Sequence, residues 1–156
     1  MAETPPAPRL EFAFEAVAEI GAPLDVGVTP HGRRRIIPVL GGRFEGPAVR
    51  GRILPGGADW QILRDDGLAE LDARYTLETD RGALIYVSNR GLRHGPPEVM
   101  QKLNAGLPVD PGSYYFRTVA AFETSAPECE WLTRAIFLGA AERFPDKVVV
   151  RFWRLA

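Results

Sequence analysis

The stretch "GLAELDARYTLET", residues 67–79, alternates strictly between two kinds of side chain. Every second position is apolar or aromatic: Ala69, Leu71, Ala73, Tyr75 and Leu77. The positions between them are polar: Glu70, Asp72, Arg74, Thr76 and Glu78. Because successive side chains of a β-strand point to opposite faces, the stretch predicts a strand with one apolar face and one charged face.

Glycine-containing turn signals flank this strand at intervals of roughly ten residues, with β-branched and aromatic runs between them. They include "LGG" (40–42), "PGG" (55–57), "DDG" (65–67), "TDRG" (79–82) and "NRG" (89–91). This spacing predicts antiparallel hairpins, because glycine adopts the positive φ angles that tight turns need. The predicted strands are residues 10–20, 33–44, 47–54, 58–64, 68–78, 83–89, 114–124, 134–142 and 147–155.

The predicted fold is all-β: a single antiparallel up-and-down β-barrel of about eight to ten strands, since closure removes exposed sheet edges. A β-sandwich is the alternative. One short helix is predicted over residues 97–105, where Pro97 suits the first turn and Gly106 suits the position after the last. Residues 1–8 are predicted to be a flexible N-terminal tail, and residues 9–156 a single β-barrel domain.

Composition narrows the class of function. Nineteen Lys and Arg residues against twenty Asp and Glu residues leave a net charge of −1, so we expect no nucleic-acid partner. The sequence has no recognisable secretory signal and no apolar run of membrane-spanning length, which predicts a cytoplasmic protein without membrane association. Neither a phosphate-binding glycine loop nor a metal-ligand motif occurs, so we expect no cofactor and no metal.

The charged face of 67–79 allows two interpretations. Antiparallel sheets commonly keep one face in water. Alternatively, a barrel of about eight strands encloses room for one small ligand, and arginines among aromatic neighbours suit anion-facing positions. The residues alone favour the solvated face, and a pocket inside the barrel lined by the charged face stays open as the alternative. The predicted catalytic residues are Asp72, Arg74 and Arg117. The predicted ligand-binding residues are Asp59, Trp60, Glu70, Tyr86, Tyr114 and Glu123.

Several longer motifs resemble one family, called domain of unknown function 3237. They are "TPHGRRRIIPVLGGRFEGP" (29–47), "GRILPGGADWQ" (51–61), "DGLAELDARYTLETDRGALIYVSNRG" (66–91), "DPGSYYFRTVAAFET" (110–124) and "ECEWLTRAIFLGAAER" (128–143). The resemblance runs from about Leu10 to the C-terminus and implies a small bacterial β-barrel, often self-associating, with no general activity assigned. Cys129 stands where the family pattern has an aromatic residue.

The resemblance favours the pocket over the solvated face, because the polar residues of the family pattern coincide with those already selected by alternation. With it, we expect the charged face to line a pocket inside the barrel. Carried onto this chain, the pattern falls on Gly41, Gly42, Glu45, Gly46, Gly56, Gly57, Asp59, Asp72, Arg74, Tyr75, Tyr86, Arg117 and Glu123. Its glycines are explained by turns and close strand approach.

Three functions fit these observations. The first is a cofactor-independent acid/base enzyme, an isomerase, cyclase or lyase acting on a small carbonyl or aromatic compound. In it Asp72 or Glu70 would take a proton, and Arg74 and Arg117 would stabilise an oxyanion. The second is a non-catalytic small-molecule-binding module. The third is a structural homo-oligomer, a homodimer or larger, with a buried ion-pair network. The sequence leaves open whether a reaction is catalysed.

Overall fold

The structure is a computed structural model that describes residues 2–156. It contains ten strands, one α-helix and two 3-10 helices. The strands are β1 (Leu10–Ile20), β2 (Leu24–Thr29), β3 (Gly32–Glu45), β4 (Arg50–Ile53), β5 (Gly57–Leu63), β6 (Ala69–Thr79), β7 (Leu84–His94), β8 (Tyr115–Glu123), β9 (Ile136–Arg143) and β10 (Lys147–Leu155). The helices are α1 (Pro97–Asn104), η1 (Pro111–Ser113) and η2 (Pro127–Thr133).

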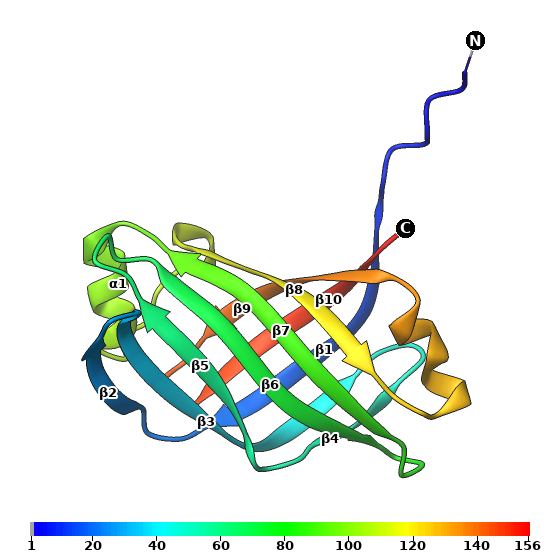
Figure 1. The fold of residues 1–156 in the computed structure, drawn as a ribbon, viewed down its shortest axis with the longest axis horizontal. Helices are drawn as coiled ribbons and strands as arrows, with labels where there is room; N and C mark the ends of the chain where they lie inside the picture. The colour runs from blue at the N-terminus through cyan, green and yellow to red at the C-terminus, as the bar shows by residue number, and fades with distance from the viewer. Residues whose placement is uncertain (1) are drawn as a thin grey trace.

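The strands close into an antiparallel barrel (Figure 1). Strands β5 to β10 follow one another around the wall, β10 pairs with β1, and β1 pairs with β3, which returns to β5. Two further strands supplement this circuit. Strand β2 adds to the edge of β3, and the short β4 bridges β3 and β6 beyond the end of β5. The predicted up-and-down barrel is therefore confirmed.

A glycine pair in β3 permits the closure. On one side β3 pairs first with β5 and then with β4, and on the other it pairs with β1. At Gly42, which has a φ of +139°, an added Cβ would overlap the carbonyl oxygen of Val17 in β1. Only glycine tolerates both this backbone conformation and the close approach of the two strands.

One end of the barrel is filled by phenylalanines. Five of them pack at centroid distances of 4.8–5.7 Å: Phe14, Phe44, Phe122, Phe137 and Phe152. The η2 helix covers this end and buries Cys129 and Leu132 against the cluster (Figure 1). Helix α1 lies at the opposite end, next to β2 (Figure 1). The apolar core is thus concentrated at the η2 end.

The predicted element bounds agree with the structure to within a few residues, with two exceptions. Strand β2 was not predicted, although its apolar residues Leu24, Val26 and Val28 alternate with less apolar ones; in the structure these three apolar side chains are exposed. Strand β7 continues to His94, past the "NRG" motif read as a turn. Gly91 of that motif lies inside the strand, where an added Cβ would overlap the carbonyl oxygen of Arg117 in β8. This glycine serves close strand approach rather than a turn.

Residues 2–9 are exposed and form no helix or strand, and Met1 of the predicted tail lies outside the described residues. The backbone of Arg9 exchanges two hydrogen bonds with that of Ala156, so the chain ends meet beside β1 and β10. Within residues 2–156, none of the helices has the length and apolar character needed to cross a membrane.

Candidate functional site: a polar cavity inside the barrel

The charged face of β6 points away from the barrel interior. Leu71, Tyr75 and Leu77 are buried inside, while Glu70 and Arg74 are exposed on the outside. The expectation that this charged face lines an internal pocket is therefore wrong. The physical reason is that the apolar face of β6 belongs to the barrel core, so the alternation carries its partner face to the outer surface.

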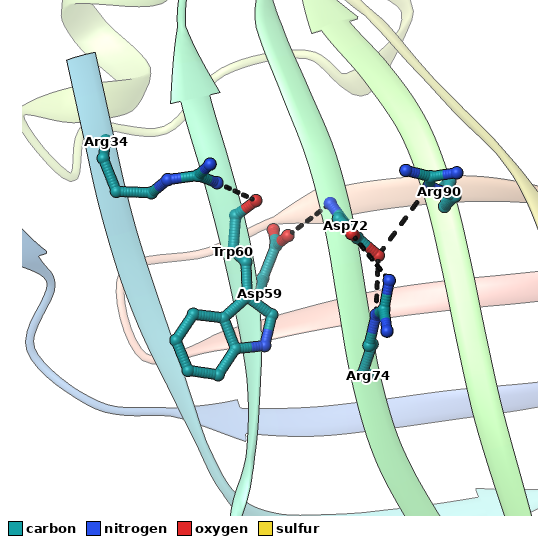
Figure 2. Close-up of polar contacts among 6 residues, drawn as sticks. All are labelled: Arg34, Asp59, Trp60, Asp72, Arg74 and Arg90. Atoms are coloured by element: carbon teal, nitrogen blue, oxygen red, sulfur yellow. Dashed lines mark hydrogen bonds and ion pairs between the residues drawn. The ribbon is translucent and has the colours of Figure 1, made fainter. Parts of the chain in front are cut away.

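The outer charges form ion pairs with one another (Figure 2). Asp72 accepts from Arg74 at 3.2 Å and lies 3.9 Å from Arg90, and Glu70 lies 3.8 Å from Arg64. A hollow of about 520 Å³ on this face, over Trp60 and Asp72, opens broadly to solvent. Such pairs are typical of a solvated sheet face and contribute little free energy of folding.

Most of the other predicted site residues also lie on the outside. Trp60, Tyr86, Arg117 and Glu123 are exposed on the outer faces of β5, β7 and β8. Tyr114 is buried, and its hydroxyl accepts a hydrogen bond from the backbone N–H of Arg143 at 3.1 Å. Of the nine predicted catalytic and ligand-binding residues, Asp59 is the one that lines the internal cavity. The catalytic and binding roles assigned from sequence stay predictions.

The barrel interior at the end opposite η2 holds a cavity of about 60 Å³. This space exceeds several-fold what one water molecule requires. Its polar lining consists of Asp59, Gln61, Asn89, Arg93, Thr118 and Arg143. Its apolar lining includes Ala18, Ile20, Ile37, Val39, Leu71, Val148 and Val150. Arg143, Ile20 and Val148 are partly exposed, so this end of the cavity faces solvent.

Asp59 is built into the wall between β5 and β6. The pairing of these strands skips Trp60 and Gln61, and there Asp59 Oδ1 accepts a hydrogen bond from the Asp72 backbone N–H at 3.0 Å (Figure 2). The Trp60 carbonyl, freed from the ladder, accepts from the Arg34 side chain at 3.3 Å (Figure 2). The interrupted ladder thus holds one carboxylate at the cavity wall.

Burial raises the pKa of Asp59 above its ordinary value, and its two hydrogen bonds oppose that rise. Gln61 Nε2 donates to Asp59 Oδ2 at 2.8 Å, and Gln61 Oε1 accepts from Arg35 at 2.8 and 3.0 Å. The half-buried Arg35 therefore fixes the orientation of the Gln61 amide, which in turn fixes the carboxylate. Each carboxylate oxygen has two lone pairs, so Asp59 retains capacity toward the cavity.

Three residues that line this cavity each have one buried side-chain atom without a hydrogen-bond partner among residues 2–156. These atoms are Asn89 Oδ1, Arg93 Nε and Thr118 Oγ1. Their residues are 3–5% exposed. An unpaired buried polar atom costs about 1–3 kcal/mol, and most such groups in folded proteins are satisfied. Three residues that line one cavity therefore keep unused hydrogen-bonding capacity.

Thr118 occupies its position because both neighbouring strands carry glycine beside it. Gly91 in β7 and Gly139 in β9 are its register partners. A Cβ at Gly139 would overlap Thr118 Oγ1, and a Cβ at Gly91 would contact the Thr118 methyl group at 2.6 Å. The two glycines thus leave room for the threonine side chain within the wall.

Burial lowers the pKa values of the three arginines at the polar end, Arg35, Arg93 and Arg143, with the nearby positive charges adding to the effect on Arg35 and Arg93. The pKa of Arg93 falls to about 10. The ion pairs described within residues 2–156 all involve other arginines. The guanidinium of Arg93 instead lies over the Phe116 ring, 5.4 Å from its centroid.

The sequence analysis missed Gln61, Asn89, Arg93, Thr118 and Arg143. A usable signal was present, since Asn89 continues the Ile85 and Val87 face and Thr118 lies between Phe116 and Ala120. A polar residue in phase with buried apolar ones marks the inner face of a strand. Arg93 was missed because the predicted strand ended at residue 89. No group of three or more His, Cys, Asp or Glu side chains suited to a metal ion occurs in the described part of the chain.

Comparison with known proteins gives close relatives over nearly the whole chain. A UPF0311 protein from Rhodopseudomonas palustris (strain TIE-1) is 48% identical over 145 residues, covering 92% of this chain and 95% of its own. The crystal structure of a conserved protein of unknown function from R. palustris superposes with a TM-score of 0.92 at 44% identity, covering 98% and 100% of the two chains. The crystal structure of a β-barrel-like protein from Acinetobacter baumannii AYE superposes with a TM-score of 0.87 at 43% identity. The match covers 99% of this chain and 100% of that protein's chain.

Two fungal proteins are more distant. The PR-toxin biosynthesis cluster protein 7 of Penicillium roqueforti is 25% identical over 155 residues, covering 86% of this chain and 82% of its own. A structure described as an enzyme from Penicillium herquei covers both chains fully with a TM-score of 0.74, but at 21% identity it shows a shared fold alone. The family described as protein of unknown function DUF3237 matches residues 8–155, and with the bacterial relatives this confirms the resemblance: the chain belongs to the DUF3237 family.

Proposed function

We propose that the cavity at the polar end of the barrel binds a small organic molecule and that Asp59 exchanges a proton with it. The observation that carries this proposal is that three residues lining one cavity, Asn89, Arg93 and Thr118, each have a buried polar atom without a partner among residues 2–156. A ligand with hydrogen-bonding groups would relieve the cost of leaving these atoms unpaired.

The residues suit acid/base chemistry on a small carbonyl or aromatic compound. Asp59 has a raised pKa, which makes its carboxylate a stronger proton acceptor than an ordinary aspartate, and its oxygens keep lone pairs beyond the two hydrogen bonds they accept. In the forward step the Asp59 carboxylate accepts a proton from the ligand and becomes a carboxylic acid. The electron pair left on the ligand moves onto an oxygen that Arg93 and Thr118 can stabilise. Return of the proton to a different atom of the ligand completes an isomerisation. In a cyclisation the electron pair instead forms the ring bond to an electrophilic atom, and the atom that receives the displaced electrons takes the proton from Asp59. In an elimination the electron pair forms a double bond as the bond to the leaving group breaks, and the leaving group takes the proton from Asp59.

The fungal relatives are compatible with this class of chemistry. One is named for a toxin biosynthesis cluster and the other is described as an enzyme. Neither name identifies a substrate for this chain, so the proposal rests on the cavity.

Two alternatives make different predictions. A non-catalytic binding module would use the same cavity without proton transfer. A structural homo-oligomer with a buried ion-pair network would need its internal charges paired, whereas Arg93 Nε has no partner among residues 2–156. The unpaired atoms therefore favour a ligand site over an internal network. Homo-oligomerisation itself stays a prediction.

The test compares Asp59→Asn with Asp72→Asn. The two aspartates lie on the neighbouring strands β5 and β6, but Asp59 lines the internal cavity and Asp72 lies on the outer face of the barrel. Binding of small aryl ketones and phenols is followed by ligand-observed NMR, and deuterium uptake beside the ketone by proton NMR in D₂O. We expect at least tenfold slower exchange in Asp59→Asn and less than twofold change in Asp72→Asn.

The opposite ranking of the two variants would place the reactive site on the outer face, as the sequence predicts. Binding without exchange in the unmodified protein would contradict proton transfer and leave the binding module. An absence of binding throughout the panel would contradict the proposal as a whole.

A further inference from the structure

The polar end of the barrel concentrates positive charge. Arg35, Arg93 and Arg143 lie at this end, and Arg93 and Arg143 line the cavity directly. Asp59 is the carboxylate that lines it. Even with Asp59 ionised, three guanidinium groups lie near one carboxylate, with Arg93 buried and Arg35 and Arg143 partly exposed. Like charges in this partly buried region repel, so the arrangement favours an additional negative charge from elsewhere.

Arg35 and Arg143 donate hydrogen bonds to neutral amide oxygens, which do not neutralise the positive charges of these arginines. Arg35 donates twice to the amide oxygen of Gln61, and Arg143 donates to the Asn104 side chain of α1 at 3.0 Å. Arg93 is 3% exposed and its Nε has no hydrogen-bond partner among the described residues. The outer-face Arg74, by contrast, pairs with a carboxylate within its own strand.

From this geometry we infer that the ligand of the barrel cavity is a small organic anion of the carboxylate class, with its charged oxygens held at Arg93 and Thr118. The inference rests on the proposed function, because it specifies the ligand of the same site. A guanidinium matches the geometry of a carboxylate, and the threonine hydroxyl can donate to a second oxygen.

The rest of the cavity indicates what the anion carries. Opposite the polar set, the wall consists of aliphatic side chains from β1, β3 and β10: Ala18, Ile37, Val39, Val148 and Val150. Such a wall excludes water from one side of the ligand and suits an apolar or aromatic body. The cavity measures about 60 Å³, less than the roughly 150 Å³ of a cavity that holds benzene, so an aromatic body would extend through the end that faces solvent. Benzoate combines both parts and serves as the probe.

The experiment is a calorimetric titration of the full chain with benzoate and with benzamide, which has nearly the same shape but no charge. Acetate and inorganic phosphate are titrated in parallel to separate organic from simple anions. We expect benzoate to bind at least tenfold more tightly than benzamide and than either simple anion. Arg93→Met should weaken benzoate binding at least tenfold, whereas Arg117→Met, at an exposed arginine of the outer face, should change it less than twofold.

The outcomes separate this inference from the proposed function. Equal binding of benzoate and benzamide, or unchanged benzoate binding in a folded Arg93→Met protein, would overturn the anion inference while leaving a neutral-ligand site intact. Equal weakening by Arg93→Met and Arg117→Met would reduce the effect to overall charge and also overturn it. An absence of binding by all four compounds would overturn the anion inference, and the ketone and phenol panel would then decide the proposed function alone.

Discussion

Asp59 and Arg93 each hold an ionisable group where burial opposes its charge. The pKa of Asp59 is raised and that of Arg93 is lowered to about 10, in both cases chiefly by burial. Each charge therefore costs the folded protein free energy that a purely structural residue would not. Proteins commonly tolerate such costs at binding and catalytic sites.

For Asp59 the cost depends on pH in a defined direction. A carboxyl whose pKa is raised on folding binds its proton more tightly in the folded than in the unfolded state. Its contribution to the free energy of unfolding therefore falls as pH rises from the ordinary value of 3.8 through the folded pKa. We expect the stability of Asp59→Asn relative to the unmodified protein to increase as pH rises from about 4 to 7.

Urea unfolding at a series of pH values measures this difference. Asp65→Asn, at an exposed turn, controls for the loss of one carboxylate. A difference independent of pH would mean that Asp59 titrates in the folded protein as it does in the unfolded chain.

For Arg93, the unfavourable free energy of burying the charged guanidinium applies at every pH below the pKa that this group has in the folded protein. A drop from 12.5 to about 10 corresponds to roughly 3 kcal/mol against the charged form. Arg93→Met should therefore raise the free energy of unfolding of the ligand-free protein by about 1–3 kcal/mol, as happens when a buried charge gives way to an apolar side chain. Chemical denaturation compares it with Arg117→Met. Clear destabilisation by Arg93→Met alone would show that the guanidinium is satisfied within the protein.

At the level of strands, the cavity depends on how β7, β8 and β9 pack beside one another. Thr118 in β8 fits between Gly91 and Gly139, its partners in the two neighbouring strands. The Thr118 side chain fits into the barrel wall without pushing the strands apart, because neither Gly91 nor Gly139 has a Cβ at this position.

Gly139→Ala should destabilise the protein by about 1–3 kcal/mol, because the added methyl overlaps Thr118 Oγ1. Thr118→Ala in the same chain should restore most of that loss by removing the clash. A double-mutant cycle measured by thermal unfolding gives the coupling between the two sites. Simple addition of the two single effects would contradict the proposed fit.

The same strands show what alternation in sequence can and cannot predict. In β6 it divided the residues into two faces correctly, but it did not say that the charged face is outside. Charged residues that pair with neighbours on the next strand, as Asp72 does with Arg90, look the same in sequence as residues lining a pocket. The inner polar residues were fewer and interspersed among apolar ones, and Arg93 lay beyond a glycine that was read as a turn.

Across the whole molecule, the two ends of the barrel differ in what fills them. The phenylalanine cluster under η2 supplies the tightly packed core, and the opposite end holds the polar cavity. The barrel itself was predictable, since turn spacing and strand pattern are local properties of the chain. The position of the cavity was not, because it depends on which end the large side chains fill.

This division predicts that stability and binding can be changed separately. Phe137→Leu, at a fully buried position of the cluster, should lower the free energy of unfolding by about 1–3 kcal/mol. Because Phe137 does not line the cavity, benzoate affinity should stay within twofold of the unmodified value. Calorimetry below the unfolding temperature provides the check. Loss of affinity in step with stability would contradict the separation of the two ends.

The central claim is that the ligand site lies inside the barrel and not on the charged outer face. Its most direct test is a crystal structure of the protein soaked with benzoate. We predict electron density in the cavity, with carboxylate oxygens within hydrogen-bond distance of Arg93 and Thr118. Density confined to the outer face between Arg74 and Arg117, with the internal cavity filled only by water, would contradict the account.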